Sequence, residues 1–403
     1  MLKCRNMIPF YRPYYDHLEL LAALRPGPAR REFESAMAAR AGARYGLAFA
    51  YGHVGLIAAF KALGLTQAEV ILPAYTCVVM ARAVVASGNR PTFVDIDLAD
   101  YNMDVSALKR ALTPRTRAVV ATHMFGYPAD VDAARAAVGD ERVIIVEDSA
   151  LSLNAISSES GGLRGDLGLF SLGIGKPIST FKGGLLVTNS SDLYEKIKVY
   201  RDKELNQTLF KTQAKRWTWL LASYLVFRKG IYGLWHRAPA KLARNVGREN
   251  LPPGYVPGDV ALAYPHFQAR VGLVQLRKVD SMLAKRRALA ELYDRELGDV
   301  SGLSPAPIIP GATYSHYTLR INRCDEINFP LRMFAQGVPV DRTFDYALPL
   351  LEPYRPYAKG RYPRAEQAAR EVVNLPLYPD LSVTNARYVA ECTRRALEGG
   401  FEP

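Results

Sequence analysis

Short apolar segments alternate with stretches of helical periodicity over the first half of this chain of 403 residues. Apolar segments with the length and composition of buried β-strands occur at 45–49, 69–72, 91–96, 118–122 and 143–146. Helical patterns lie between them, at 52–63, 76–87, 105–112 and 130–139. Such alternation is typical of βαβ units. The pattern therefore predicts an α/β fold with a mostly parallel sheet between helices.

The pattern changes in the last third of the chain. A proline and glycine stretch at 252–258 precedes one long helical pattern at 269–297. After it, strands are predicted at 317–322 and 338–340, and helices at 327–336, 366–373 and 383–397. We therefore expect a large domain at 1–250 with an N-terminal arm, a linker and connecting helix at 251–300, and a small α+β domain at 301–403.

One lysine, Lys176, stands in a glycine-broken turn between apolar segments at 167–172 and 184–188. Such a lysine is usually a solvated loop residue, but a Schiff-base lysine also needs a rigid turn that faces a pocket. Asp148 favours the second interpretation. It follows the apolar segment at 143–146, and carboxylates at the carboxyl ends of parallel strands face the ligand crevice. Pyridoxal phosphate requires both a lysine and an acid that keeps its ring nitrogen protonated.

Two further features have a functional and a structural interpretation. The turn from Tyr51 to Gly55 opens a helix with small residues, which presents free N–H groups to an anion, but it equally fits an ordinary strand–helix turn. His123 ends a predicted strand, and a histidine there is more often part of the core than of a site.

Short motifs occur in a characteristic order along nearly the whole chain. They are Ile8-Pro-Phe10, Leu72-Pro-Ala-Tyr-Thr76, Phe93-Val-Asp-Ile-Asp97, Thr113-Pro-Arg-Thr116, His123-Met-Phe-Gly-Tyr-Pro128, Val146-Glu-Asp148, Ala365-Glu366 and Leu375-Pro-Leu-Tyr-Pro379. Each is weak alone, but together and in this order the chain resembles the DegT/StrS-type sugar aminotransferases, which are fold-type I pyridoxal phosphate (PLP) enzymes.

The resemblance implies a role for several residues. Lys176 would bind PLP and move a proton, and Asp148 would pair with the pyridinium nitrogen. The phosphate would be held by Ser171 and the backbone of Gly52, His53 and Val54. The implied reaction moves an amino group from an amino-acid donor, commonly glutamate, to a keto-sugar acceptor. The implied assembly is a homodimer with the active site at the interface.

Some positions around the cofactor depart from the family pattern. Cys77 stands where an aromatic residue commonly stacks on the cofactor ring, and Tyr75 could replace it from another angle. Leu151 stands in place of a glutamine, and Lys182 in place of an acid before a Gly-Gly pair. We still count Cys77 and Leu151 among the residues expected around the cofactor.

Two substrate or subunit contacts depart as well. The family's G-x-N-Y-R segment, which sends an asparagine to the neighbouring subunit, has no match around 260–264, and a His-Tyr pair reads Asp345-Tyr346. The lysine and aspartate that the chemistry requires are kept, whereas these contacts differ. This favours a keto-sugar that is not an ordinary nucleotide-sugar, for example a lipid-linked one.

The net charge of +13 is concentrated at 205–248, which holds nine basic residues, no acid and all three tryptophans, Trp217, Trp219 and Trp235. The basic residues are Lys211, Lys215, Arg216, Arg228, Lys229, Arg237, Lys241, Arg244 and Arg248. Aromatic residues among basic ones fit an interfacial segment on an anionic membrane, and equally an insertion packed at a subunit interface. The chain shows no usual nucleic-acid-binding module, so we expect no nucleic-acid partner.

The remaining composition indicates a compartment. The chain has no apolar run of 18 residues, its N-terminus lacks the apolar core of a secretory signal, and its four cysteines are isolated. This fits a cytoplasmic protein, with or without attachment to the inner face of the membrane, and no metal site. Two alternatives stay open: a PLP enzyme of another reaction type, and a non-catalytic membrane-associated paralogue. The retained Lys176 and Asp148 argue against the paralogue.

Overall fold

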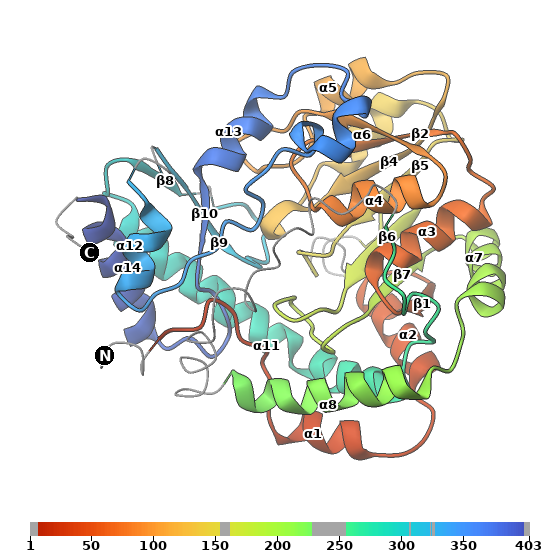
Figure 1. Cartoon of the computed structure of the whole chain (residues 1–403), viewed down its shortest axis with the longest axis horizontal. Coiled ribbons are helices and arrows are strands. Elements are labelled where there is room, and N and C mark those ends of the chain that lie inside the picture. The colour runs from red at the N-terminus through yellow and green to blue at the C-terminus, as the bar shows by residue number, and fades with distance from the viewer. Residues whose placement is uncertain are drawn as a thin grey trace.

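The computed structural model describes residues 7–153, 162–227, 255–305, 308–322, 324 and 327–398. Within these residues a seven-stranded sheet has the spatial order β1-β7-β6-β5-β4-β2-β3 (Figure 1). Its strands are β1 Tyr45–Phe49, β2 Glu69–Pro73, β3 Arg90–Val94, β4 Thr116–Thr122, β5 Ile144–Asp148, β6 Leu167–Ser171 and β7 Gly184–Thr188. The five strands β3, β2, β4, β5 and β6, which are neighbours in the sheet in this order, are parallel, whereas β7 is antiparallel to both β1 and β6. The predicted α/β fold with a mostly parallel sheet is confirmed.

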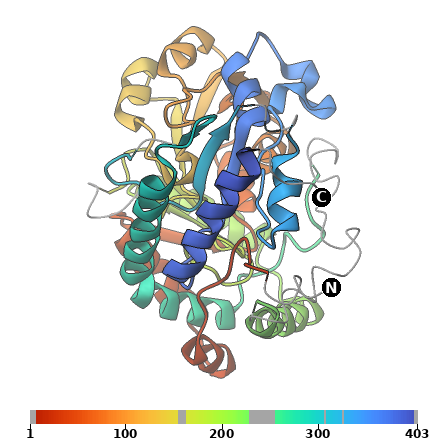
Figure 2. The ribbon, with the colours of Figure 1, turned by 90° about the vertical axis from the view of Figure 1, so that its left-hand side faces the viewer.

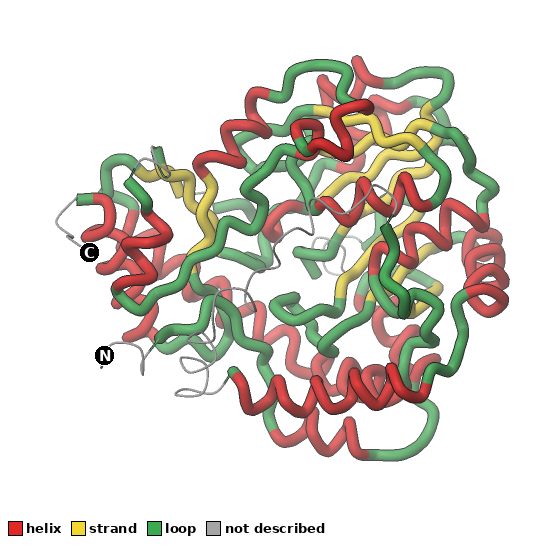
Figure 3. The backbone as a smooth tube through the Cα atoms, in the orientation of Figure 1, coloured by secondary structure: helices red, strands yellow, loops and turns green. Residues whose placement is uncertain are grey.

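Helices cover both faces of this sheet, and the strands of Figure 3 lie among them. Side chains alternate along each strand, so Leu169 and Leu186 pack on the side of α3 (Gly52–Ala62) and α4 (Val78–Ala86). Their neighbours in sequence, such as Phe170, pack on the side of α2 (Arg30–Arg40) and α11 (His266–Leu297). Burial on both faces is what a mostly parallel sheet requires. Other helices are α2 Arg30–Arg40, α5 Val105–Ala111, α6 Val131–Val138, α7 Ser191–Glu204 and the 3-10 turn η2 Met124–Gly126.

The 32-residue helix α11 (His266–Leu297) links the large sheet to a smaller antiparallel sheet with the order β10-β9-β8 (Figure 2). The strands of the smaller sheet are β8 Leu303–Pro305, β9 Tyr317–Ile321 and β10 Val372–Leu375. The other elements of this part are α12 Phe329–Ala335, α13 Pro363–Glu371, α14 Val383–Leu397 and the 3-10 turns η4 Leu348–Leu350 and η5 Glu352–Tyr357. Buried Arg286 of α11 donates to the carbonyl oxygens of Ser315 (3.0 Å) and Leu377 (2.9 Å). The domain boundaries at 250 and 300 stay a prediction.

Three local predictions differ from the structure. The N-terminal arm contains a helix, α1 (His17–Leu24), which begins with a capping box between Asp16 and Glu19. Residues 338–340 form no strand. Residues 372–373 belong to β10 and not to a helix, because the β-branched pair leaves α13 and joins the edge of β9.

The segment at 205–248 is described as far as residue 227, and Trp235 and six of its nine basic residues lie outside the described residues. The described part forms α8 (Phe210–Val226), beside α1 at the lower edge of Figure 1. Arg216 is only 2% exposed and pairs with Asp259 at 2.8 Å. Arg216 therefore cannot face a lipid surface, so it is not among the basic residues that could attract one.

The two described tryptophans differ in exposure. Trp217 is half-buried and donates its indole N–H to the Ala23 carbonyl of α1 at 3.3 Å, whereas Trp219 is 43% exposed. Among the described residues, every helix is too short or too polar to cross a bilayer.

Candidate active site

Asp148 lies where the carboxyl ends of β4, β5 and β6 meet. It is the last residue of β5, and the sheet register pairs it with Thr122 on β4 and Leu169 on β6. Its side chain is buried and its Oδ1 accepts a hydrogen bond from the Ala150 N–H at 3.0 Å. Burial raises the pKa of Asp148, while that hydrogen bond and the charge of Lys176 act in the opposite direction.

Lys176 lies in the connection between β6 and β7, and its main-chain N–H donates to the Gly173 carbonyl at 3.2 Å. Burial lowers the pKa of Lys176, and the nearby Cys77 and Asp148 oppose this shift. Burial also raises the pKa of the Cys77 thiol. The three side chains therefore lie near one another, with Asp148 buried and Lys176 and Cys77 half-buried. A lysine in such surroundings is a neutral amine, and so a nucleophile, far more often than a solvated lysine.

The start of α3 lies against the ends of β6 and β7. A Cβ atom on Gly184 would lie 2.2 Å from Gly52 Cα, so glycine is required for β7 to approach α3 this closely. A Cβ atom on Gly52 would lie 3.2 Å from the carbonyl oxygen of Phe170. Gly52 therefore sits beside Ser171, the next residue along β6.

This helix end can bind an anion. Tyr51 begins α3 without a side-chain capping hydrogen bond, and the first N–H groups of a helix have no partner inside it. These N–H groups belong to Gly52, His53 and Val54. Ser171 adjoins them. A Cβ atom on Gly173 would lie 3.8 Å from Ser171 Oγ and 4.0 Å from Lys176 Cγ, so the hydroxyl and the lysine flank the same glycine.

The side chain of His53 adds a polar atom that sequence reasoning did not use. Its Nε2 is buried and, within the described part of the chain, has no hydrogen-bond partner. Burial lowers the pKa of His53 to about 4, and the charge of Arg82 acts in the same direction. The imidazole is therefore neutral at pH 7, and its unpartnered nitrogen suits a ligand atom.

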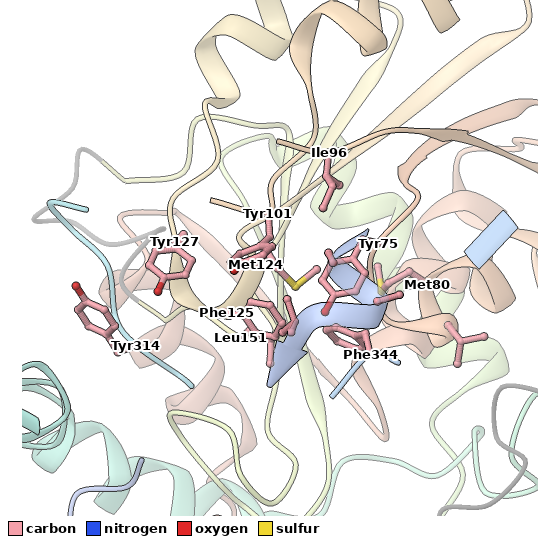
Figure 4. Close-up of a cluster of buried hydrophobic side chains, with 14 of the residues drawn as sticks. Tyr75, Met80, Ile96, Tyr101, Met124, Phe125, Tyr127, Leu151, Tyr314 and Phe344 are labelled. Carbon is pink, nitrogen blue, oxygen red and sulfur yellow. The ribbon is translucent and has the colours of Figure 1, made fainter. Parts of the chain in front are cut away.

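Three other residues singled out in the sequence, His123, Leu151 and Tyr75, are packed in the core of the protein. His123 is buried with both ring nitrogens engaged: Nε2 lies 3.2 Å from Glu147 and Nδ1 accepts from the Ala129 N–H at 2.9 Å. Leu151 and Tyr75 pack in the aromatic cluster of Figure 4, where Tyr75 contacts the Phe344 ring edge-on at 5.8 Å. Cys77, at the start of α4, is the position that adjoins the lysine.

Two residues from the C-terminal part lie beside these residues: His316, which no sequence motif indicated, and Tyr346, which belongs to the Asp345-Tyr346 pair. His316 precedes β9, and burial lowers its pKa to about 3, with the charge of Lys176 in the same direction. Tyr346 accepts a hydrogen bond at its Oη from the Val78 N–H, next to Cys77, at 3.1 Å. Their proximity arises from tertiary contact, which local sequence does not encode.

This geometry agrees with the comparisons to known proteins. The model of the DegT/DnrJ/EryC1/StrS aminotransferase family matches residues 18–222 and 261–394. The chain is 28% identical to the dTDP-4-dehydro-2,3,6-trideoxy-D-glucose 4-aminotransferase of Saccharopolyspora spinosa, over 82% of this chain and 78% of that protein. It is also 28% identical to the UDP-2-acetamido-2-deoxy-3-oxo-D-glucuronate aminotransferase of Pseudomonas aeruginosa, over 90% and 89%.

A solved structure is similar along its whole length. The aminotransferase TlmJ of Streptoalloteichus hindustanus superposes with a TM-score of 0.76 at 28% identity, and the match covers 97% of this chain and 99% of that one. The fold and site define a PLP-dependent aminotransferase. The chain belongs to the DegT/DnrJ/EryC1/StrS aminotransferase family.

The residues present fit the cofactor. PLP needs a lysine to bind it, a carboxylate for its ring nitrogen and hydrogen-bond donors for its phosphate. The site offers a lysine of lowered pKa, a carboxylate at the end of a strand and the free N–H groups of a helix start. The unpartnered Nε2 of His53 lies at that helix start. No cluster of residues suited to a metal ion occurs in the described ranges.

Proposed function

We propose that this enzyme transfers an amino group from glutamate to a keto-sugar, with Lys176 and Asp148 as its catalytic residues. The single observation that supports the assignment is that Lys176 and Asp148 lie close enough together at the carboxyl edge of the sheet for the charge of each to act on the other, with Cys77 beside the lysine. The substrate class rests on the two relatives, whose names specify keto-sugars joined to nucleotides.

Each residue has a distinct task in this proposal. When bound, PLP withdraws electrons from the α-carbon of the substrate. Lys176 would hold the cofactor through Nζ until the amine of the donor takes its place, and the released Nζ, as a neutral amine, would then take the proton from that α-carbon. Asp148 pairs with the protonated ring nitrogen, which favours the ionised carboxylate that burial alone disfavours. Ser171 and the N–H groups of Gly52, His53 and Val54 orient the phosphate.

The two half-reactions give the test. We expect purified protein to have a visible absorption band that glutamate bleaches, with release of one 2-oxo acid per site. A keto-sugar should then restore the band. A band that no amino acid bleaches would contradict the proposal, and bleaching that consumes the donor by elimination would favour another reaction type on the same fold.

We propose a homodimer as the working assembly, because the family resemblance implies an active site at a subunit interface. The missing G-x-N-Y-R segment bears on this point. Residues 260–264 read Val-Ala-Leu-Ala-Tyr and supply no asparagine for a partner's phosphate. In this proposal each subunit holds the phosphate with its own residues. Light scattering of active enzyme should give a dimer, and an active monomer would contradict it.

We also propose that the enzyme works at an anionic membrane on a lipid-linked keto-sugar. The supporting observation is the surface of α8 and α1. Phe210, Trp219 and Leu225 of α8 are exposed, together with the basic Lys211 and Lys215. The neighbouring α1 adds exposed leucines: Leu18, Leu21 and Leu24. Basic residues among exposed apolar ones suit an anionic lipid surface.

A further inference from the structure

A cavity of about 820 Å³ lies beside the start of β1, between α2, α7 and the first residue of α11. Its wall includes Tyr45 and Gly46, which begin β1. β1 and β6 are both antiparallel to β7, so β1 runs in the same direction as β6 and β5. Asp148 and Lys176 lie where β5 and β6 end, whereas this cavity lies where β1 begins. The cavity is therefore at the opposite edge of the large sheet from the candidate active site.

Arginines dominate the charged part of the wall. The basic side chains are Arg30, Arg31, Arg44, Lys198 and Arg201, and the acidic ones are Glu32, Glu34 and Asp202. Two of these cations are already neutralised. Arg201 is 7% exposed and pairs with Glu34 at 2.7 Å and with Asp202 at 2.9 Å. Lys198 pairs with Glu195 of its own helix at 3.3 Å.

The other three arginines of the cavity have no carboxylate as a partner. Arg30 is half-buried and donates to the neutral side-chain oxygen of Asn206 at 2.8 Å. Arg31 and Arg44 are exposed, and no acidic side chain among the described residues lies within ion-pair distance of them. Burial lowers the pKa of Arg30, so an anion beside it would favour its charged form. Against these three stands one carboxylate of the wall that has no ion pair within the described ranges, Glu32.

The start of α2 adds main-chain donors to the same cavity. His266 caps this helix from α11, because its Nδ1 accepts from the N–H groups of Ala29 (3.0 Å) and Arg30 (3.3 Å). The next two N–H groups, those of Arg31 and Glu32, have no acceptor among the residues that the structure describes. Free N–H groups at a helix start attract anions, and the positive end of the helix dipole adds to the charge of the arginines.

Two stacked tyrosines form another part of the wall. The rings of Tyr45 and Tyr194 lie 4.7 Å apart at an interplanar angle of 21°, and Lys198 Nζ lies 5.5 Å from the centre of the Tyr194 ring. Both tyrosines are half-buried. An aromatic wall of this kind packs against a ring, while arginines bind a charged group attached to that ring.

We propose that this cavity is a second ligand site, which binds the phosphate monoester of a sugar or a nucleoside. Near neutral pH such a phosphate carries a charge of about −2 and offers three acceptor oxygens. It would accept charge-assisted hydrogen bonds from Arg30, Arg31 and Arg44 and from the free N–H groups of α2. The tyrosine pair would contact the ring of the ester. Because the cavity lies at the other edge of the sheet, this ligand is distinct from the donor and the acceptor of the proposed reaction.

Calorimetry on the PLP-loaded full-length enzyme tests the site, because the cofactor then fills the other place suited to a phosphate. The probes are inorganic phosphate, uridine monophosphate and glucose 6-phosphate. We expect at least one ester to bind about tenfold tighter than inorganic phosphate or better, and the tighter ester identifies the ring. The inference is overturned if neither ester binds. It is equally overturned if all three bind alike, since the cavity would then hold an adventitious ion only.

The informative variant is Arg31→Glu, and its matched control is Arg25→Glu. Both arginines are exposed and have no ion-pair partner in the described part of the chain, but only Arg31 lines the cavity. An acid in the first turn suits the helix dipole, so Arg31→Glu should fold, and thermal unfolding checks this. We expect it to weaken binding of the tighter ester about tenfold or more, and the control to change it less than about twofold. Equal effects would indicate attraction by the general surface charge and overturn the inference.

The glutamate half-reaction separates this cavity from the active site. In Arg31→Glu its rate should stay within about twofold of that of the unaltered enzyme, because the two sites are far apart. A half-reaction that falls together with ester binding would place the ester at the active site and overturn the inference. An unaltered enzyme that lacks the half-reaction but loses ester binding in Arg31→Glu alone would overturn the proposed function and support the cavity.

Discussion

Asp148 and Lys176 lie near each other at the carboxyl edge of the large sheet, and the charge of each favours the ionised form of the other. Burial raises the pKa of Asp148 and lowers that of Lys176, and each group's charge opposes the shift of the other. Without a ligand, burial thus drives both groups towards neutrality. A protonated ring nitrogen beside Asp148 would restore the carboxylate, so the pair is suited to a ligand that brings a positive charge.

Adjacent residues of β5 allow catalytic and structural roles to be separated. We expect Asp148→Asn to retain some cofactor but to slow the glutamate half-reaction about a hundredfold or more, because a neutral amide cannot hold the ring proton. Its thermal stability should not fall, since the substitution removes a carboxylate whose burial is unfavourable. Stopped-flow absorbance and thermal unfolding measure the two effects, and near-normal turnover in this variant would refute the role of Asp148.

Glu147→Gln is the control. Glu147 accepts hydrogen bonds from the N–H groups of Arg164 (2.7 Å) and Gly165 (2.5 Å) and contacts His123. An amide here places an NH₂ group against N–H donors, and we expect a loss of about 1–3 kcal/mol in the free energy of unfolding. The half-reaction of the folded fraction should stay within a few-fold of normal. If Glu147→Gln instead slows the half-reaction and Asp148→Asn lowers stability, Glu147 has the catalytic role and Asp148 the structural one.

Cofactor uptake should depend on pH through Lys176. Only the neutral amine attacks the cofactor aldehyde, so the rate of uptake by cofactor-free enzyme should rise with pH and level off below the usual lysine pKa of 10.5. The carboxylate of Asp148 favours the charged ammonium, and its removal lowers the pKa of Lys176 further. The inflection should therefore move to lower pH in Asp148→Asn. A shift to higher pH would show that the two groups do not interact as described.

The carboxylate of Glu69 should make the stability of the fold depend on pH in the acidic range. Burial opposes the charge of Glu69, but hydrogen bonds from Lys359 (2.8 Å), Thr113 (2.7 Å) and Arg115 (2.9 Å) outweigh it and lower its pKa to about 2. A lowered carboxyl pKa stabilises the fold above about pH 4.5, and the contribution is lost as the pH falls towards 2. Glu69→Gln should thus lower the melting temperature at pH 7, and the difference from the unaltered protein should shrink below pH 4.5. A difference independent of pH would contradict this account.

The α8 surface can be tested with vesicles. We expect the protein to sediment with anionic but not neutral vesicles at low salt, and high salt should release it. Trp219→Ala should weaken this binding several-fold. Trp217→Ala, whose indole packs on α1, should lower stability and leave the binding largely intact. If Trp219→Ala instead changes the oligomeric state and no vesicle binding occurs, α8 is a subunit interface.

The sequence predicted the large sheet well because each strand there is a short apolar run between helical patterns. It failed where tertiary contacts decide, as at Val372 and Val373, which continue a helical pattern but pair with β9. Lys176 and Asp148 could be proposed as site residues from the sequence because each lies in a local motif. His316 could not, because only folding brings it to the lysine.

The basic segment shows the same limit from another direction. The family match stops at residue 222, inside this segment. Composition could not tell that Arg216 turns inward, because its partner Asp259 lies 43 residues further along the chain. A count of charges in one segment therefore overestimates how many face outward.

The most direct test of the account is to trap the cofactor on the protein. Borohydride reduction of the PLP-loaded enzyme, followed by proteolysis and mass spectrometry, identifies the lysine that carries it. The account predicts a single modified residue, Lys176. Modification of Lys182, which lies in the same connection between β6 and β7, or of no lysine at all, would contradict it.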